Sequence, residues 1–88
     1  MKIILILFSL LILTLPLLAQ STGILYLKKV NSKFGWFENG NDKIDWTYVG
    51  EIKNDKPNGT GLLRTTFGKY SGEFKNGMMD GQGTFTNT

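Results

Sequence analysis

The amino-acid sequence predicts an all-β fold: a single-layer antiparallel β-meander of stacked hairpins behind an N-terminal signal peptide. Beyond residue 20, short runs of β-branched and aromatic residues alternate with glycine and asparagine, and no helical period is present. The stretch Tyr-x-Gly-Glu-x-Lys-Asn occurs twice, 22 residues apart, starting at Tyr48 and Tyr70, and Gly-x-Gly follows each copy. A motif repeated at a fixed interval indicates architecture rather than a catalytic centre.

The N-terminal residues have the pattern of a secretory signal peptide. Lys2 supplies a positive charge, residues 3–18 form a nearly unbroken apolar run of 16 residues, and Ala19 precedes polar sequence. This run is shorter than the roughly 20 residues that cross a bilayer as a helix, and Pro16 near its end suits a cleavage region. We expect cleavage after Ala19 and an exported protein of bacterial type, which is periplasmic, attached to the cell envelope or secreted.

An uncleaved N-terminal membrane anchor stays open as the alternative. Leu17, three positions before the expected cleavage site, is bulkier than signal peptidase prefers. A lipoprotein is disfavoured, because the chain has no cysteine to carry the lipid.

Length and composition favour a small non-catalytic domain. The 88 residues include neither cysteine nor histidine, which removes the usual nucleophile–base pairs and the common zinc sites. Without residues 1–19 the chain keeps 9 basic and 7 acidic side chains. This excess of positive charge is too small to indicate nucleic-acid binding. We expect no enzymatic activity, no cofactor, no metal, no nucleic acid and no small-molecule substrate.

Six strands are predicted in chain order, with neighbours in sequence as neighbours in the sheet. Each intervening joint contains residues that tolerate positive φ or bond their own backbone. The expected strands are residues 23–30, 34–37, 44–53, 61–67, 70–75 and 82–86. The expected joints are residues 31–32, 38–43, 54–59, 68–69 and 76–81.

Alternation of side chains along the strands gives each repeat one aromatic–glycine face and one charged or polar face. Glu51, Glu73 and the lysines that follow them fall on the polar face. Glycine inside a strand is costly unless a neighbour uses the missing side chain. We therefore expect a ring on one strand to lie over a glycine on the next. The aromatic–glycine face comprises Tyr48, Gly50, Ile52, Gly61, Leu63, Tyr70, Gly72, Phe74, Gly83 and Phe85.

These two stretches resemble MORN (membrane occupation and recognition nexus) repeats, whose pattern is Tyr-x-Gly-x-aromatic, a short polar turn and Gly-x-Gly. Ile52 in place of an aromatic residue, and Asp55 where the second copy has Gly77, make the first copy divergent. The resemblance implies an elongated single-layer sheet of stacked hairpins. The repeat-defining residues are Tyr48, Gly50, Gly59, Gly61, Tyr70, Gly72, Phe74, Gly81 and Gly83.

The resemblance divides the chain into a signal peptide (1–19), an atypical leading β segment (20–47), a first repeat (48–69) and a second repeat (70–88). Trp36, Phe37 and Trp46 can cover the open end of the first repeat, as a terminal cap does. Arrays of this kind need about three units for stability. We therefore expect either a fragment of a longer array or a partner that pairs with the last strand.

Three candidate chemical sites fail on their spacing. Residues 54–59 do not make a calcium loop, because the required acidic spacing fails, with Lys56 at the third position and Pro57 at the fourth. Asp42 and Asp45 do not converge on a strand or loop. The Gly-x-Gly segments are followed by no helix that would help to bind a phosphate.

The expected function is a protein-binding or scaffolding surface, with a protein partner or self-association at the open sheet edge. The alternative is a peripheral module that associates with anionic phospholipid membranes, to which the MORN family has been linked. Plant phosphatidylinositol phosphate kinases carry such repeats, but nothing in this chain resembles their catalytic domain. The possible contact residues are Trp36, Trp46, Lys53, Lys75, Met78 and Met79, with the two methionines at a turn tip.

Overall fold

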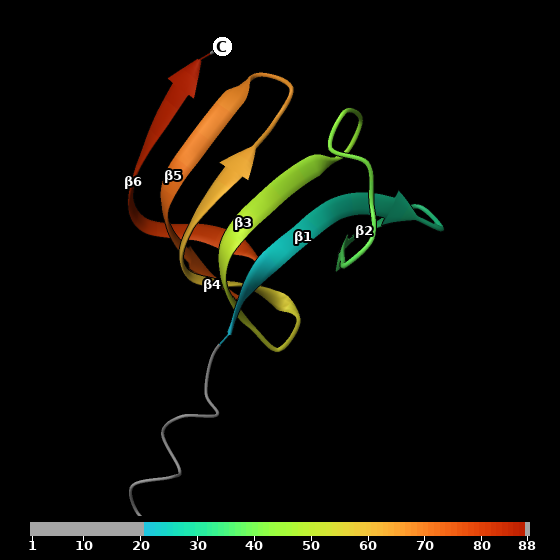
Figure 1. The fold of residues 1–88 in the computed structure, drawn as a ribbon, viewed down its shortest axis with the longest axis horizontal. Helices are drawn as coiled ribbons and strands as arrows, with labels where there is room; N and C mark the ends of the chain where they lie inside the picture. The colour runs from blue at the N-terminus through green and yellow to red at the C-terminus, as the bar shows by residue number, and fades with distance from the viewer. Residues whose placement is uncertain (1–20, 88) are drawn as a thin grey trace, which may run out of the picture.

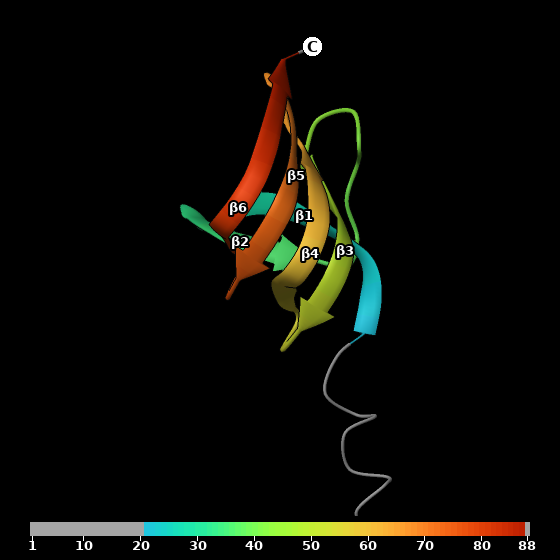
Figure 2. The same cartoon turned by 90° about the vertical axis from the view of Figure 1, so that its left-hand side faces the viewer.

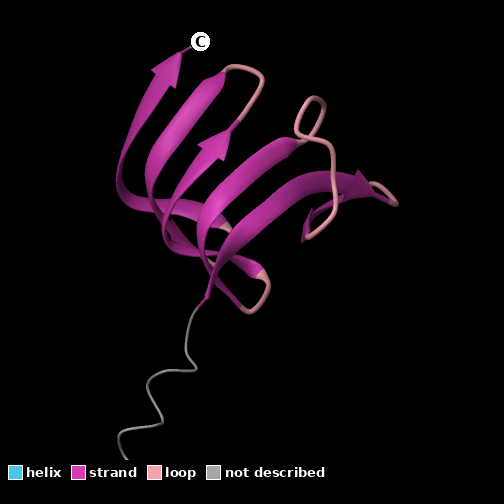
Figure 3. Cartoon of the chain, in the orientation of Figure 1, coloured by secondary structure: helices cyan, strands magenta, loops and turns pink. Residues whose placement is uncertain are grey.

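The computed structural model describes residues 21–87, and these form six β-strands and no helix (Figure 3). The predictions of a signal peptide or an anchor concern residues outside this range. Within it, no helix is long and apolar enough to cross a membrane. The strands are β1 (Ser21–Val30), β2 (Lys33–Phe37), β3 (Trp46–Lys53), β4 (Lys56–Arg64), β5 (Gly68–Lys75) and β6 (Met78–Asn87).

All six strands belong to one open antiparallel sheet, which confirms the predicted fold class (Figure 1). The sheet order is β2-β1-β3-β4-β5-β6, so β3 to β6 form a meander and β1 lies between β2 and β3. The expectation that sequence neighbours always pair is therefore wrong for β2 and β3. β1 has 10 residues against 5 in β2, and it offers β3 the longer partner.

The hairpin turns are shorter than the sequence predicted. Only Asn54-Asp55 and Asn76-Gly77 connect the strands of the two repeats, with φ values of 54° and 62°, and 50° and 85°. Positive φ at both central residues is the turn geometry that matches the right-handed twist of a hairpin. The expected joints 54–59 and 76–81 are wrong in length, because β4 and β6 begin directly after these turns.

Two predicted strands extend past one end of the real strands, where hydrogen bonds close local turns. Ile44 and Asp45 both donate their backbone N–H to the carbonyl of Asn41, which places them in a turn before β3. After β4, the Thr65 hydroxyl oxygen accepts the N–H groups of Phe67 and Gly68, at 3.1 and 3.2 Å. Residues 44–45 and 65–67 are therefore not part of strands.

Each repeat contains a β-bulge, and the repeated glutamate stabilises it. The register shifts between Gly50 and Ile52 in β3–β4, and at the equivalent place in β5–β6. The Thr60 N–H donates to Glu51 Oε1 at 2.6 Å, and the Gln82 N–H donates to the Glu73 carboxylate at 3.0 Å. The glutamates that the sequence placed on a polar face thus satisfy backbone donors that the bulge leaves unpaired.

The repeated tyrosine lies over a glycine of the next strand, as the sequence predicted. A Cβ atom on Gly61 would overlap the ring of Tyr48, and one on Gly83 would overlap the ring of Tyr70. The Tyr48 hydroxyl also donates to the carbonyl of Glu51 at 2.6 Å. The ring position therefore requires a residue without a side chain on the neighbouring strand.

The sheet curves, and this curvature gives a single layer a small core (Figure 2). The ring centroid of Tyr48 lies 6.2 Å from that of Trp36 on β2 and 4.8 Å from that of Phe74 on β5. β1, β3 and β4 separate β2 from β5 in the sheet order. The core comprises buried Leu25, Tyr48, Leu63 and Phe74, with half-buried Trp36, Trp46, Ile52 and Tyr70 against it.

Candidate interaction surface

Strand β6 is an open edge of the sheet, and every one of its residues is exposed. Large apolar side chains stand on it: Met78 is 72 % exposed, Met79 55 % and Phe85 51 %. Figure 1 shows this strand at one side of the sheet, beyond β5. An open edge presents unpaired backbone donors and acceptors that another strand can bind.

The equivalent residues of the first repeat show what β6 lacks. Leu63 and Phe85 are 22 residues apart and pair with the repeated tyrosines, Tyr48 and Tyr70. Leu63 is only 5 % exposed, because β5 lies beside β4, whereas Phe85 is half-exposed. Pro57 is likewise buried, while its equivalent, Met79, is not. The exposed apolar area of β6 corresponds to the area that the next strand buries in the first repeat.

The hydrogen-bonding direction of the open edge follows from one contact. The Gln82 N–H points toward β5, because it donates to Glu73. Backbone N–H groups alternate in direction along an antiparallel strand. The N–H groups of Gly83 and Phe85 therefore point away from β5, toward solvent. They are the donors available to an added strand.

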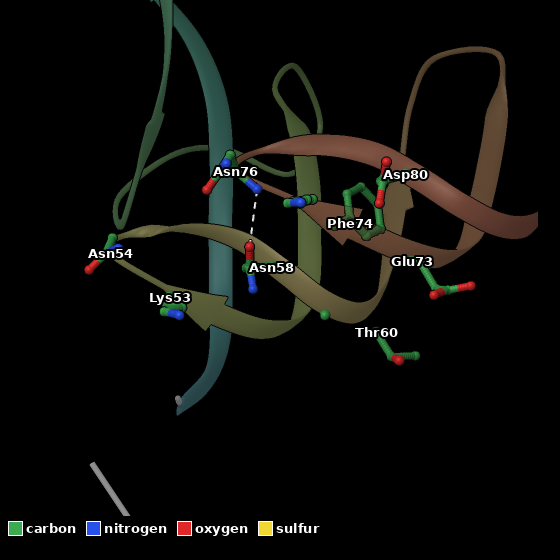
Figure 4. Close-up of a pocket in the computed structure, with 10 residues that line it drawn as sticks. Lys53, Asn54, Asn58, Thr60, Glu73, Phe74, Asn76 and Asp80 are labelled. Atoms are coloured by element: carbon green, nitrogen blue, oxygen red, sulfur yellow. Dashed lines mark hydrogen bonds between the residues drawn. The ribbon is translucent and has the colours of Figure 1, made fainter. Parts of the chain in front are cut away.

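A shallow polar pocket lies beside the turn ends of the two repeats (Figure 4). In it, the Asn76 N–H donates to Asn58 Oδ1 at 3.1 Å, which joins the start of β4 to the β5–β6 turn. Across residues 21–87 no group of three acidic side chains is placed to hold a metal ion. The pocket is lined by Lys53, Asn54, Asn58, Gly59, Thr60, Glu73, Phe74, Lys75, Asn76 and Asp80.

Basic side chains gather in two places. Lys53 pairs with Lys56 across the first turn, and Lys75 stands beside it at the same end of the sheet. On the hairpin of β1 and β2, Lys28 Nζ lies 5.0 Å from the ring centroid of Phe37. The lysines of the first group are exposed, whereas Lys28 is half-buried. Next to it, the exposed Lys29 makes a second cation–π contact, with its Nζ 5.6 Å from the ring centroid of Phe34.

The six predicted contact residues occupy different environments. Trp36 and Trp46 are half-buried and pack on the core. Lys53 and Lys75 are exposed at the pocket in Figure 4. The prediction that the methionines form a turn tip is wrong: both belong to β6, where Met78 pairs with Lys75 and Met79 with Phe74. The structure thus brings Lys75 and Met78 together, and the Trp36 indole lies beside the turn between them, at Gly77.

Sequence reasoning did not select Phe85 as a contact residue. The signal was present, because Phe85 is the equivalent of Leu63 in a repeat whose next strand would bury it. It also did not identify the role of Glu51 and Glu73, since side-chain alternation alone cannot predict a bulge.

The Tyr48 hydroxyl has a perturbed pKa. Burial disfavours the phenolate, and the nearby Glu51 carboxylate adds repulsion, so that the pKa of Tyr48 is raised from 10.0 to about 12. The hydroxyl is therefore a neutral hydrogen-bond donor at physiological pH. It fixes the ring in place and has no role as a base.

Comparison with known proteins agrees with this geometry. The MORN repeat family matches residues 48–65 and 70–88. The first match covers the hairpin of β3 and β4, and the second covers that of β5 and β6. Neither a curated protein nor a solved structure matches the chain. MORN repeats are generally protein- or membrane-binding modules, and two hairpins of this chain match that repeat.

Proposed function

We propose that this protein is an exported, non-catalytic binding module that holds a protein partner at the open edge formed by β6. The contrast between buried Leu63 and half-exposed Phe85 supports this proposal most directly. A further strand covers Leu63 but not the equivalent Phe85. A strand of a binding partner can cover such an edge.

The roles of the repeated residues support a structural module rather than an enzyme. The tyrosines pack over glycines, the glutamates accept backbone N–H groups, and the asparagines adopt the positive φ of the turns. The recurring tyrosine, glutamate and asparagine therefore serve the hairpin itself. The exposed apolar side chains and the outward backbone N–H groups of β6 are the groups available to a binding partner.

Affinity capture with chemical crosslinking tests the proposal when edge variants are compared. Phe85→Lys places a charge on the open edge, whereas Phe34→Lys changes a phenylalanine that is 69 % exposed on the opposite edge strand, β2. We expect recovery of the partner to fall about tenfold with Phe85→Lys and to stay unchanged with Phe34→Lys. Circular dichroism checks that both variants keep the sheet. Equal recovery with both variants would contradict the proposal.

Association with an anionic membrane is the second candidate. Lys53, Lys56 and Lys75 lie at one end of the sheet, next to exposed Met78. Clustered lysines beside an apolar side chain suit a negatively charged lipid surface. Co-sedimentation with phosphatidylserine vesicles should then decrease with salt and with the double change Lys53→Glu and Lys75→Glu. Lys69→Glu, at the other end of β5, is the control.

Export is part of the proposal and rests on residues 1–19. Expression of the full chain in a secreting bacterial cell, followed by intact-mass measurement, tests it. The mass of the recovered protein should correspond to a chain that starts at Gln20. Recovery of the full-length chain in the membrane fraction would favour the anchor instead.

A further inference from the structure

The two repeats allow the missing neighbour of β6 to be deduced residue by residue. β4 is the equivalent of β6, and β5 is the strand that covers β4. In that pair Gly59 lies opposite Phe74, Gly61 opposite Gly72, and Leu63 opposite Tyr70. Moving this register forward by one repeat places the same partner types opposite Gly81, Gly83 and Phe85.

From this register we infer that the β6 edge binds an antiparallel strand of another polypeptide with the pattern Tyr-x-Gly-x-aromatic. The tyrosine of that strand lies opposite Phe85, its glycine opposite Gly83, and its second aromatic residue opposite Gly81. This inference rests on the proposed function and specifies the chemistry of the partner.

The glycine in the pattern has a steric reason. The ring of Tyr70 covers Gly83, as the ring of Tyr48 covers Gly61. Beside Gly61 the next strand supplies Gly72. A Cβ atom on Gly72 would stand 2.8 Å from the hydroxyl oxygen of Tyr70 on the same strand, so a side chain at the glycine of the pattern would meet the strand's own tyrosine. The two aromatic residues of the pattern, in turn, cover Phe85 and the bulge at Gly81.

No described strand with a free edge supplies this pattern, which argues against a second copy as the occupant. The other edge strand, β2, carries Lys33 two residues before Gly35, and its Trp36 packs on Tyr48. β6 itself contains a single aromatic residue, Phe85, and no tyrosine. β3 and β5 carry Tyr-x-Gly, but both are paired on each side within the sheet.

A disulfide-trapping experiment tests the strand and its register together. The chain has no cysteine, so a single introduced thiol is unique. Leu62 lies opposite Ser71 in the β4–β5 pair, and Thr84 is the equivalent of Leu62. The probe is a synthetic peptide with the sequence of β5, Gly68–Lys75, in which cysteine replaces serine at the Ser71 position. It is offered in excess to the Thr84→Cys protein in a glutathione buffer.

The expected result is selective crosslinking in the predicted register. Directly opposite positions of an antiparallel pair reach disulfide distance, so Thr84→Cys should react about tenfold more than Thr86→Cys, which lies two residues away on the same face. A peptide that also carries valine at the Gly72 position should lose this preference. Phe85→Pro, which removes an outward N–H group, should reduce trapping similarly.

Three outcomes would overturn the inference. Equal reaction of Thr84→Cys and Thr86→Cys would show that the peptide contacts β6 in no fixed register. An unaffected valine peptide would remove the glycine requirement. Concentration-dependent dimers of the unmodified protein that dissociate with Phe85→Lys would identify a second copy as the occupant. If trapping fails while Phe85→Lys still abolishes partner capture, the proposed function stands and only the strand pattern is wrong.

Discussion

Substitution of Gly61 by alanine tests the contact on which both repeats depend. A Cβ atom at this position would stand 2.5 Å from Tyr48 Cζ, about 1 Å inside ordinary carbon–carbon contact. The Tyr48 ring is fully buried between Trp36 and Phe74 and cannot swing into solvent. The backbone or the neighbouring rings must therefore move.

The size of the effect follows from three contributions. Overpacking of a core costs about 1–3 kcal/mol. A shifted ring also weakens the hydrogen bond of the Tyr48 hydroxyl to Glu51, which contributes about 1 kcal/mol. Alanine restricts the unfolded chain more than glycine does, which offsets about 0.4–1 kcal/mol of this loss. We expect Gly61→Ala to lower the free energy of unfolding by about 1–3 kcal/mol.

Urea unfolding, followed by tryptophan fluorescence and circular dichroism, measures this change. Gly23→Ala is the matched control, because its Cβ would meet only the flexible Cδ1 end of Ile52, at 3.1 Å. Gly83→Ala should cost less than Gly61→Ala, since the ring of Tyr70 is half-exposed and can rotate outward. A Gly61→Ala protein as stable as the Gly23→Ala protein would refute the packing argument.

Three further predictions concern the same hairpins. The pKa of Tyr48 is higher folded than unfolded, so its stabilising effect is complete below pH 10 and is lost as pH rises through about 12; pH-dependent unfolding should show this loss in the wild type and not in Tyr48→Phe. Glu51→Ala deprives the Thr60 N–H of its acceptor and should cost about 1 kcal/mol in urea unfolding, whereas Glu38→Ala, in an exposed loop, should have little effect. Asp55→Gly should raise the midpoint of thermal unfolding by stabilising the protein by about 0.5–1 kcal/mol, because Asp55 has a φ of 62°; an unchanged midpoint would contradict this.

The sequence predicted those features that depend on local chemistry and period. Glycine and tyrosine at a 22-residue interval were enough to predict the antiparallel sheet and the ring-over-glycine contact. The place of β1 between β2 and β3 could not be predicted in this way, because strand order depends on which partner buries more of the apolar face. The leading segment carries no repeat that would fix its pairing.

The surface of β6 was predicted in part. An open final edge followed from the repeat pattern, but the residues that form it did not. Asn76 to Gly81 read as a loop because glycine, asparagine and aspartate dominate that stretch. In the structure Gly81 lies in a bulge within β6 and not in a turn. Met78 and Met79 therefore belong to the edge strand.

The rings of Trp36, Tyr48, Phe74 and Tyr70 contact one another in that order and form a row with two different ends. Trp36 closes one end of the row by packing on Tyr48, and its indole also contacts the turn at Gly77, whereas the Tyr70 end has no such closure among the described residues. If β6 binds a partner strand as proposed, the resulting assembly has two different ends. A guest strand that brings its own closing tryptophan terminates the assembly, while one that repeats the tyrosine–glycine pattern recreates an open edge and allows growth to continue.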